Sequence, residues 1–483
     1  MTTHKYLFAC LFCTATMPLF AQQKEVLKDA AIKNIDAQYN TYKATALQIW
    51  DYAEVGFTEF KSSEALQNLL KTNGFDLKAG VADMPTAFVA TFGEGKPVIG
   101  ILAEFDALPG LAQTIEPTKK SIEGKAAGHA CGHHLFGTGS VAAAIELKNT
   151  MLKNKIKGTI KVYGTPAEEG GGGKIYMVRE GLFEGVDVVL HWHAWSSNLA
   201  NAATSLANIS VKFQFYGTSS HAAGAPERGR SALDGVEAMN NMANMMREHV
   251  PQETRMHYII TDGGKAPNVV PDFAEVYYYI RHPNIETLKE LFERLVKCAK
   301  GAALGTETRV EYEVINGVYN LLPITILSQT MHSNLTQVGG VKYNDAEMAF
   351  GKKIQESFPL QNRPPLTDAE IIQPYSEGLR KDGGSTDVGD VSWVVPTVGL
   401  RTATWIPGTG SHSWQAVACG GTDIGIKGMM NAAKTLTLTG IDLLLDKSLI
   451  EKATEEWQTR RGANYKYVSL LGNRKPPLDY QKK

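Results

Sequence analysis

Side chains that bind zinc-like ions gather at four places along this chain. Three histidines and one cysteine lie within the six residues 129–134. Two adjacent carboxylates, Glu168 and Glu169, follow the next apolar run, and His193 and His412 come later. Thiolate and imidazole are ligands that zinc and similar ions prefer. This distribution is typical of a metallohydrolase whose ligands come from separate segments.

The chemistry that suits these residues is hydrolysis at a pair of metal ions. Two divalent ions about 3.5–4 Å apart hold one hydroxide and polarise a carbonyl group. The candidate ligands are Cys131, His133, Glu169, His193 and His412. Because adjacent residues of an extended segment point to opposite sides, Glu168 need not share the role of its neighbour. Glu168 is therefore the candidate general base, which passes the proton of the water to the leaving nitrogen.

Two other interpretations stay open at this point. Cys131 with a histidine base would make a thiol hydrolase, and a chain that keeps the fold without turnover would be a non-catalytic subunit of a heteromeric hydrolase. The number of further ligand-type residues argues against the first, and the presence of both Glu168 and Glu169 argues against the second. His191 is interpreted as a packed histidine at a strand end, and His129 as either structural or close behind the ligands.

The elements that must position these residues alternate between strand and helix. Short β-branched runs predict buried strands at 98–103, 160–164, 186–191 and 399–405, with helices at 137–151 and 420–445 and two amphipathic helices between 26 and 70. Such alternation predicts an α/β sandwich with a mostly parallel sheet. Ligands gather at the carboxyl ends of the strands in these sheets, where the candidate metal residues fall.

A different pattern begins near Ile209. Period-two alternation at 211–215 predicts a half-exposed strand, and a helix, two strands, a helix and a strand follow up to Val314. The order β-α-β-β-α-β is that of a ferredoxin-like unit. Because metal-type residues stand on both sides of it, we expect an inserted domain. Residues 320–379 are expected to form surface helices and loops, and 464–483 a polar, loosely ordered tail.

The length and charge of the chain limit its class. A chain of 483 residues exceeds one ordinary core, and a net charge of −1 gives no reason to expect nucleic acid or an anionic membrane as partner. A short basic start and the apolar run 6–20, which is too short to span a bilayer, predict a signal peptide cleaved near Ala21 and therefore an exported, periplasmic or secreted protein. The mature chain would keep an odd number of cysteines (Cys131, Cys298 and Cys419), and metal ligation of Cys131 would explain an unpaired thiol there.

The expected domain boundaries follow from these patterns. They are a signal peptide at 1–21, a first catalytic part at 22–207, an inserted lid and dimerisation domain at 208–318 (the lid domain below), a second catalytic part at 319–450 and a C-terminal tail at 451–483.

Four motifs carry a resemblance to a known family. The segments 104–110 (EFDALPG), 128–135, 166–173 and 219–234 together resemble the M20 metallopeptidase/amidohydrolase family. Within that family the chain is most similar to the aminoacylase-like branch that holds the B-type subunits of p-aminobenzoyl-glutamate hydrolases. Segments 177–183 and 385–393 strengthen the match, which covers about 34–445.

The resemblance implies a zinc-peptidase-like catalytic domain with an inserted lid that forms a homodimer. It implies two divalent ions, zinc or manganese, and hydrolysis of N-acyl or N-aroyl amino acids, such as p-aminobenzoyl-glutamate, or of dipeptides. The implied roles are as follows: Cys131 bridges the ions; His133, Glu169, His193 and His412 complete the ligands; Glu168 is the base; Asp106 orients a ligand; His221 reaches across the dimer to the substrate carbonyl; and Asn268 and Arg281 hold the substrate carboxylate.

One residue departs from the family pattern. His134 stands where related sequences carry Asn or Asp. An additional imidazole there would either alter the metal preference or lie behind the ligands. The export signal also separates this chain from a cytoplasmic role in folate breakdown.

Overall fold

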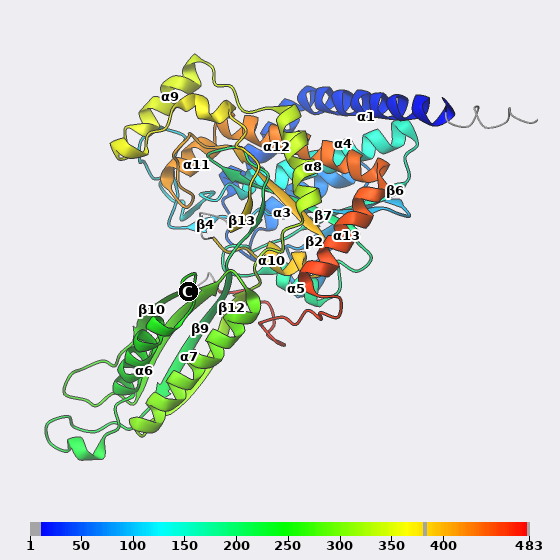
Figure 1. Cartoon of the computed structure of the whole chain (residues 1–483). Coiled ribbons are helices and arrows are strands. Elements are labelled where there is room, and N and C mark those ends of the chain that lie inside the picture. The colour runs from blue at the N-terminus through cyan, green and yellow to red at the C-terminus, as the bar shows by residue number, and fades with distance from the viewer. Residues whose placement is uncertain (1–10, 380–383, 481–483) are drawn as a thin grey trace, which may run out of the picture.

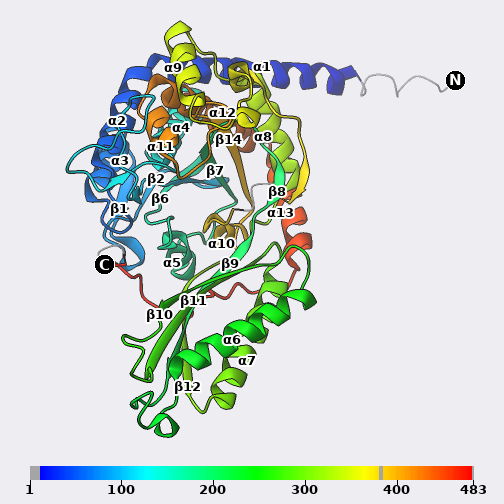
Figure 2. The same cartoon turned by 90° about the vertical axis from the view of Figure 1, so that its left-hand side faces the viewer.

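The computed structural model describes residues 11–379 and 384–480, with side chains from Gln22 onward. The expected signal peptide at 1–21 therefore lies largely outside the described residues, since only the backbone of 11–21 is described, as the start of helix α1 (Leu11–Ala37). In Figures 1 and 2 the first part of α1 extends beyond the body of the molecule. Within the described ranges, every helix is too short or too polar to cross a bilayer.

A mixed sheet forms the centre of the catalytic domain. Its described strands lie in the order β1-β2-β6-β3-β7-β14, and the last four of these run parallel. Their bounds are β1 (Asp76–Ala79), β2 (Phe88–Glu94), β3 (Val98–Ala103), β6 (Gly158–Gly164), β7 (Val188–Trp195) and β14 (Thr397–Ala403). The parallel strands are buried apolar runs, as expected where helices cover both faces. This confirms the predicted α/β class.

Helices pack along the sheet and close the core. The helix α4 packs on β3, β6 and β7, and α12 packs on α4, β7 and β14 (Figure 1). Besides α1, the described helices of this domain are α2 (Tyr39–Tyr52), α3 (Phe60–Thr72), α4 (His133–Asn154), α5 (Gly173–Arg179), α8 (Thr325–Val338), α9 (Asp345–Gln355), α10 (Val388–Ser392), α11 (Trp414–Gly420), α12 (Asp423–Leu445) and α13 (Lys447–Arg461). Short strands β4 (Leu108–Pro109), β5 (Ala127–Gly128), β8 (Ala202–Thr204) and β13 (Glu377–Leu379) lie in the connecting loops.

Two predicted boundaries were wrong. Residues 26–70 hold parts of three helices rather than two, because Gln38 leaves the helical conformation between α1 and α2, and Ala53, in a left-handed conformation, ends α2 before α3 begins. The strand predicted at 186–191 continues to Trp195, since its parallel pairing with β14 extends to Ala403. His191 and His193 therefore both lie within β7, with the intervening Trp192 on the opposite face.

The lid domain is a separate two-layer unit. Its antiparallel sheet has the order β10-β11-β9-β12, and α6 and α7 pack on one face of it (Figure 2). The bounds are β9 (Ala207–Tyr216), α6 (Ala232–Met246), β10 (Arg255–Asp262), β11 (Phe273–His282), α7 (Ile285–Gly305) and β12 (Arg309–Val318). Ser231 and Asn284 cap the two helices. The order confirms the predicted ferredoxin-like fold.

The expectation of a loosely ordered tail was wrong for the described residues 464–480. Leu471 is 6% exposed, and the hydroxyl group of Tyr467 donates a hydrogen bond of 2.6 Å to Asp390. The aromatic ring of Tyr465 packs against Trp393. Leu471 is buried and Tyr465, Tyr467 and Tyr480 are half-buried, although Val468 is exposed, so contacts with distant residues hold the segment.

The contact between this segment and Asp390 predicts a pH-dependent stability. Burial raises the pKa of Asp390 from its ordinary value of 3.8 to about 7, despite hydrogen bonds from Tyr467 and Tyr319. A carboxyl group with a raised folded-state pKa contributes stability that is full below about pH 3.8 and is lost as the pH rises towards 7, at most roughly 4 kcal/mol. Asp390→Asn should therefore stabilise the protein at pH 8 more than at pH 5.5 in thermal melts. The exposed Asp29→Asn is the control, and a pH-independent difference between wild type and Asp390→Asn would contradict the assignment.

Candidate metal centre

The candidate ligands meet at the carboxyl ends of the parallel strands. Glu168 and Glu169 follow β6, His193 lies near the end of β7, and His412 lies between β14 and α11. Cys131 and His133 lie at the start of α4, after the loop that follows β3. This is the edge of an α/β sheet at which ligands usually bind.

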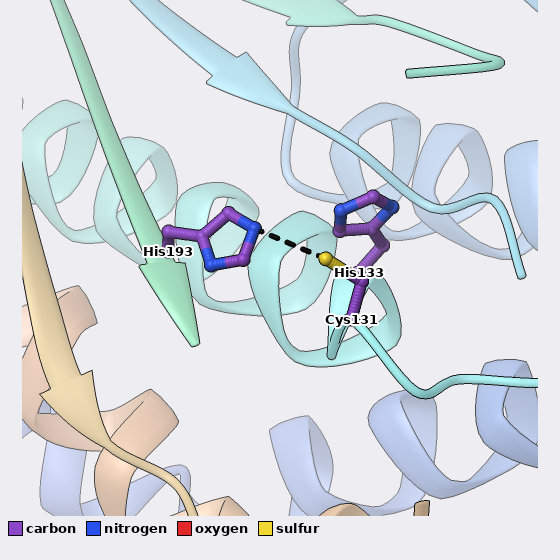
Figure 3. Close-up of side chains that lie close together, drawn as sticks. All are labelled: Cys131, His133 and His193. Atoms are coloured by element: carbon purple, nitrogen blue, oxygen red, sulfur yellow. Dashed lines mark hydrogen bonds between the residues drawn. The ribbon is translucent and has the colours of Figure 1, made fainter. Parts of the chain in front are cut away.

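Close approach of two segments brings Cys131 and His133 to His193. Gly132 has a φ of +79°, and a Cβ atom there would lie 2.4 Å from the Cβ atom of Ala194. Only glycine fits this position, which lets the tight turn press against β7. The Cys131 Sγ and His193 Nε2 atoms are 3.4 Å apart, and the three side chains converge (Figure 3).

The candidate ligands form three groups, and the ligand atoms within each group lie within 4.8 Å of one another. They are Cys131 with His133 and His193, Cys131 with Glu169 and His412, and His133 with Glu168 and Glu169. Cys131, His133 and Glu169 each belong to two groups. An arrangement in which neighbouring groups share members is suited to two ions rather than one.

The histidines are oriented by oxygen atoms behind them. His133 Nδ1 donates to Asp106 Oδ1 at 2.8 Å, and His193 Nδ1 donates to the carbonyl oxygen of Ala194 at 2.7 Å. In the neutral form that binds metal, each ring has its Nε2 lone pair free for the cluster, as metal-bound histidines do. His133 Nε2 is buried without a hydrogen-bond partner although Glu104 Oε2 is 3.1 Å away. Buried nitrogen and oxygen atoms of this kind need a partner, and a cation fits the donor set.

Charge in this region is concentrated and buried. Burial raises the pKa of the Cys131 thiol well above its ordinary value, and the charge of Glu169 adds to this effect. Burial opposes protonation of His133, but the charges of Cys131, Asp106 and Glu104 outweigh it and raise the pKa of His133. The region therefore combines a buried thiol, buried carboxylates and an imidazole, which is the composition of a site that binds a positive ion.

The turn that carries Glu168 and Glu169 is held from two directions by carboxylates. Asp106 Oδ2 accepts a hydrogen bond from the Glu169 N–H at 2.9 Å, and Glu59 Oε1 accepts one from the Ala167 N–H at 2.9 Å. Ala167 has a φ of +57°, which is strained for a residue with a Cβ atom. The turn is therefore maintained by its surroundings rather than by local preference.

A buried ion network lies beside the candidate base. Lys174 Nζ is 2.7 Å from Glu104 Oε1 and 2.6 Å from Asp387 Oδ1, and all three side chains are at most 1% exposed. Burial raises the pKa of Glu168 well above its ordinary value, and the nearby charges of Glu104 and Glu169 reinforce this. A carboxyl group with a raised pKa suits transfer of a proton near neutrality.

Two further histidines differ in their relation to the cluster. His412 reaches its group from a strained backbone (φ +57°), with Nε2 at 3.1 Å from Glu169 Oε1. His134 packs against His129 and donates to the carbonyl oxygen of Gly420 at 3.0 Å, and it belongs to none of the three groups found among the described residues. Burial lowers the pKa of His134 to about 3, so this ring is neutral.

The predicted lid residues contact their own domain. His221 is exposed and accepts hydrogen bonds from the N–H groups of its own loop, and this loop pairs with that of Asn268. Arg281 lies on β11, 5.4 Å from the ring of Tyr279. His221 belongs to none of the ligand groups found within the described part of the chain.

Several residues near the site were missed by sequence reasoning. Glu104 and Asp387 lie in the family motifs but had no predicted role, and none was predicted for Glu59, Lys174 or Tyr480. Lys174 and Glu104 carry a usable signal, because a charged residue inside an apolar segment must find a buried partner. Glu59 and Tyr480 carry none, since only the fold brings them to the turn.

The lid and the whole chain are each similar to known proteins. The family model described as "Peptidase dimerisation domain" matches residues 206–307, which cover the lid up to the start of β12. The chain is 40% identical over 452 residues to the B-type subunit of p-aminobenzoyl-glutamate hydrolase from Escherichia coli K12, covering 88% of this chain and 93% of that protein. It is 30% identical over 460 residues to the Xaa-Arg dipeptidase of Mus musculus, covering 91% and 94%.

The fold is also found among solved structures. A dinuclear metal binding peptidase of the M20 family from Bacillus subtilis superposes with a TM-score of 0.58 at 16% identity, covering 85% of this chain and 99% of that one. Identity at this level shows the fold alone, while the two nearly full-length relatives show the family. The chain belongs to the M20 metallopeptidase/amidohydrolase family and is a hydrolase.

Proposed function

We propose that this protein hydrolyses the amide bond between an acyl or aroyl group and an amino acid, or the peptide bond of a dipeptide, at a pair of divalent ions. The observation that carries the proposal is the set of three overlapping ligand groups. Glu168 belongs to one of these groups, with His133 and Glu169. The names of the two relatives point to p-aminobenzoyl-glutamate and to dipeptides ending in arginine as substrates.

The proposed ligands are Cys131, His133, Glu169, His193 and His412, with zinc or manganese as the ions. Bound there, two ions would supply Lewis acidity that acidifies a water molecule and polarises the amide carbonyl group. Cys131 is proposed as the shared ligand because it is the residue common to the groups that contain His193 and His412. Asp106 orients His133, and His134 lies behind His129 without a direct role.

Glu168 is proposed as the proton carrier of the reaction. Its carboxylate takes the proton of the attacking water and delivers it to the leaving nitrogen. Burial and nearby negative charges raise the pKa of this group, which favours uptake of the proton in the first half of that transfer. Asp106 and Glu59 hold the turn so that the carboxylate keeps its position during both steps.

The lid is proposed to complete the site across a homodimer. His221 is exposed and belongs to none of the ligand groups found among the described residues, which suits contact with the partner subunit's substrate. There its imidazole would stabilise the oxyanion that forms at the carbonyl carbon. Asn268 and Arg281 would hold the substrate carboxylate, which guanidinium binds in a bidentate manner.

The cysteine-nucleophile alternative is disfavoured by the state of the thiol. A nucleophilic cysteine needs a lowered pKa, whereas burial raises that of Cys131. The non-catalytic subunit alternative is addressed by testing the chain alone and together with a paralogue.

Export is proposed from the composition of residues 1–21. The basic start and the apolar run of 6–20 are those of a cleaved signal. Amino-terminal sequencing of the protein recovered outside the cytoplasm should begin near residue 22, and an intact Met1 would contradict cleavage.

A substrate panel tests the proposal most directly. The purified chain is assayed with p-aminobenzoyl-glutamate, hippurate and dipeptides ending in arginine, glutamate or leucine. We expect one class to exceed the others by at least about tenfold in kcat/KM, since a site built to hydrogen-bond a polar group discriminates strongly against substrates that lack it. No hydrolysis of any member by the fully metal-loaded chain would contradict the proposed activity.

A further inference from the structure

The C-terminal segment, residues 464–480, connects three parts of the molecule that are distant in sequence. It leaves α13 on the catalytic domain, passes the lid junction and ends beside the Glu168–Glu169 turn. Figure 2 shows this red segment crossing between the two domains towards the C-terminal end. Such a segment can hold the Glu168–Glu169 turn in place only if the residues before its end are themselves bound to the rest of the protein.

Its anchors lie on both domains. Arg474 donates to the carbonyl oxygen of Val314 at 2.7 Å and forms an ion pair of 2.8 Å with Glu313, both on β12 of the lid. On the catalytic side, Arg179 donates to the carbonyl oxygen of Arg474 at 2.6 Å. These contacts hold the chain a few residues before Tyr480.

Tyr480 occupies a close-fitting position beside the site. Its ring packs edge-on against Phe57, with centroids 5.7 Å apart. A Cβ atom at Gly56 would lie 2.5 Å from the Tyr480 hydroxyl oxygen, so the glycine leaves the space that the hydroxyl group fills. The hydroxyl group donates to the carbonyl oxygen of Glu169 at 2.7 Å.

The contacted carbonyl group stands where a run of glycines begins, and the N–H of the same peptide unit, that of Gly170, donates to the carbonyl oxygen of Glu168 at 2.7 Å. Glu169 is followed by the glycines 170–173, and Gly170 has a φ of +89°. Glycine lacks the steric limits that would keep a peptide plane in one orientation. Asp106 holds the N–H side of Glu169, but the C=O side begins the glycine run, and Tyr480 restrains it.

We propose that Tyr480 is a positioning residue that fixes the Glu169 peptide, and with it the carboxylates of Glu168 and Glu169, from the C-terminal end of the chain. The inference rests on the ligand role proposed for Glu169. Loss of the hydroxyl group leaves the turn freer, so that metal binding must first order it, at a cost in affinity and in turnover.

The test is Tyr480→Phe, which removes only the hydroxyl group. The matched control is Tyr465→Phe, in the same segment, whose hydroxyl group contacts the hydroxyl group of Tyr319 instead of the turn. Metal affinity is measured by competition with a chromophoric chelator, using Zn²⁺ and Co²⁺, and the visible spectrum of the Co²⁺-loaded protein reports ligand geometry.

We expect Tyr480→Phe to weaken metal binding by about three- to tenfold, the range set by one neutral hydrogen bond, and to change the Co²⁺ spectrum. Turnover should fall by a similar factor with KM nearly unchanged, while the melting temperature of the metal-free protein stays at that of Tyr465→Phe. Wild-type affinity and spectrum in Tyr480→Phe would overturn the proposal. An equal loss of affinity in Tyr465→Phe would also overturn it, since the effect would then be general.

The two proposals fail separately. If wild-type protein binds metal but hydrolyses no tested amide, the proposed function fails while affinity and spectrum still decide the role of Tyr480. If hydrolysis is strong and Tyr480→Phe matches wild type in every measurement, only the positioning role fails.

Discussion

Glu168→Gln is expected to lower kcat by about 10²–10⁴-fold, the usual contribution of a general base, while both metal ions stay bound. Glutamine keeps the shape of the side chain but cannot accept the proton of the attacking water. Glu168 occurs in only one of the three groups of possible ligands, the one with His133 and Glu169, so the other two groups do not depend on it. The measurement is steady-state hydrolysis together with metal content by elemental analysis.

The matched control is Glu180→Gln, at a glutamate that follows α5 and lies outside the ligand groups. It should retain wild-type turnover and metal content. Unchanged turnover in Glu168→Gln would exclude the proposed base. Loss of metal together with turnover would instead make Glu168 a ligand, and Glu169 would then need a new role.

Cys131→Ala is expected to weaken binding of both metal ions by at least about 100-fold, whereas His193→Ala and His412→Ala should each weaken mainly one. The reason is the overlap of the groups: Cys131 lies with His133 and His193 in one and with Glu169 and His412 in another. Loss of an orienting group behind a ligand already costs about 10–100-fold in affinity, so loss of a shared ligand should cost more. Isothermal titration of the metal-free protein with Zn²⁺ gives the stoichiometry and both affinities.

Cys419→Ala is the control for this experiment, because Cys419 is also a buried, free thiol. Its metal stoichiometry should match wild type. Two ions bound at wild-type affinity by Cys131→Ala would contradict the shared-ligand assignment. Activity that survives chelation in wild type but disappears in Cys131→Ala would move the assignment to a cysteine nucleophile.

The fold was largely predictable because its elements have local signals. Strand β6 is a β-branched run bounded by glycine, β3 is a short apolar run of valine, isoleucine and leucine, and the lid alternates with period two along β9. Boundaries were less predictable where pairing decides them. His193 lies inside β7 rather than after it because the neighbouring β14 extends the ladder to Trp195, and no residue near His193 carries that information.

The course of the C-terminal segment had no local signal at all. It mixes tyrosines and leucines with charged residues and two prolines and has no helical or strand period, so it carries no signal of regular structure. It is held instead by single long-range contacts, such as those of Tyr467 with Asp390 and Tyr480 with Glu169. Contacts of this kind join residues far apart in the chain, so composition cannot reveal them.

The sequence by itself determined the chemistry available to this protein: a thiol, imidazoles and paired carboxylates, each placed at the end of an apolar run, together with the motifs of a hydrolase family. Only the tertiary structure decided which of them meet. His134 stands next to His133 in the chain, yet on a helix adjacent side chains point in different directions, so one ring enters the cluster while the other turns to Gly420. Conversely, Glu59, Asp106 and Tyr480 come from three distant segments, yet all hydrogen-bond to the turn at 167–169. The packing of the sheet, the helices and the C-terminal segment brings them together there.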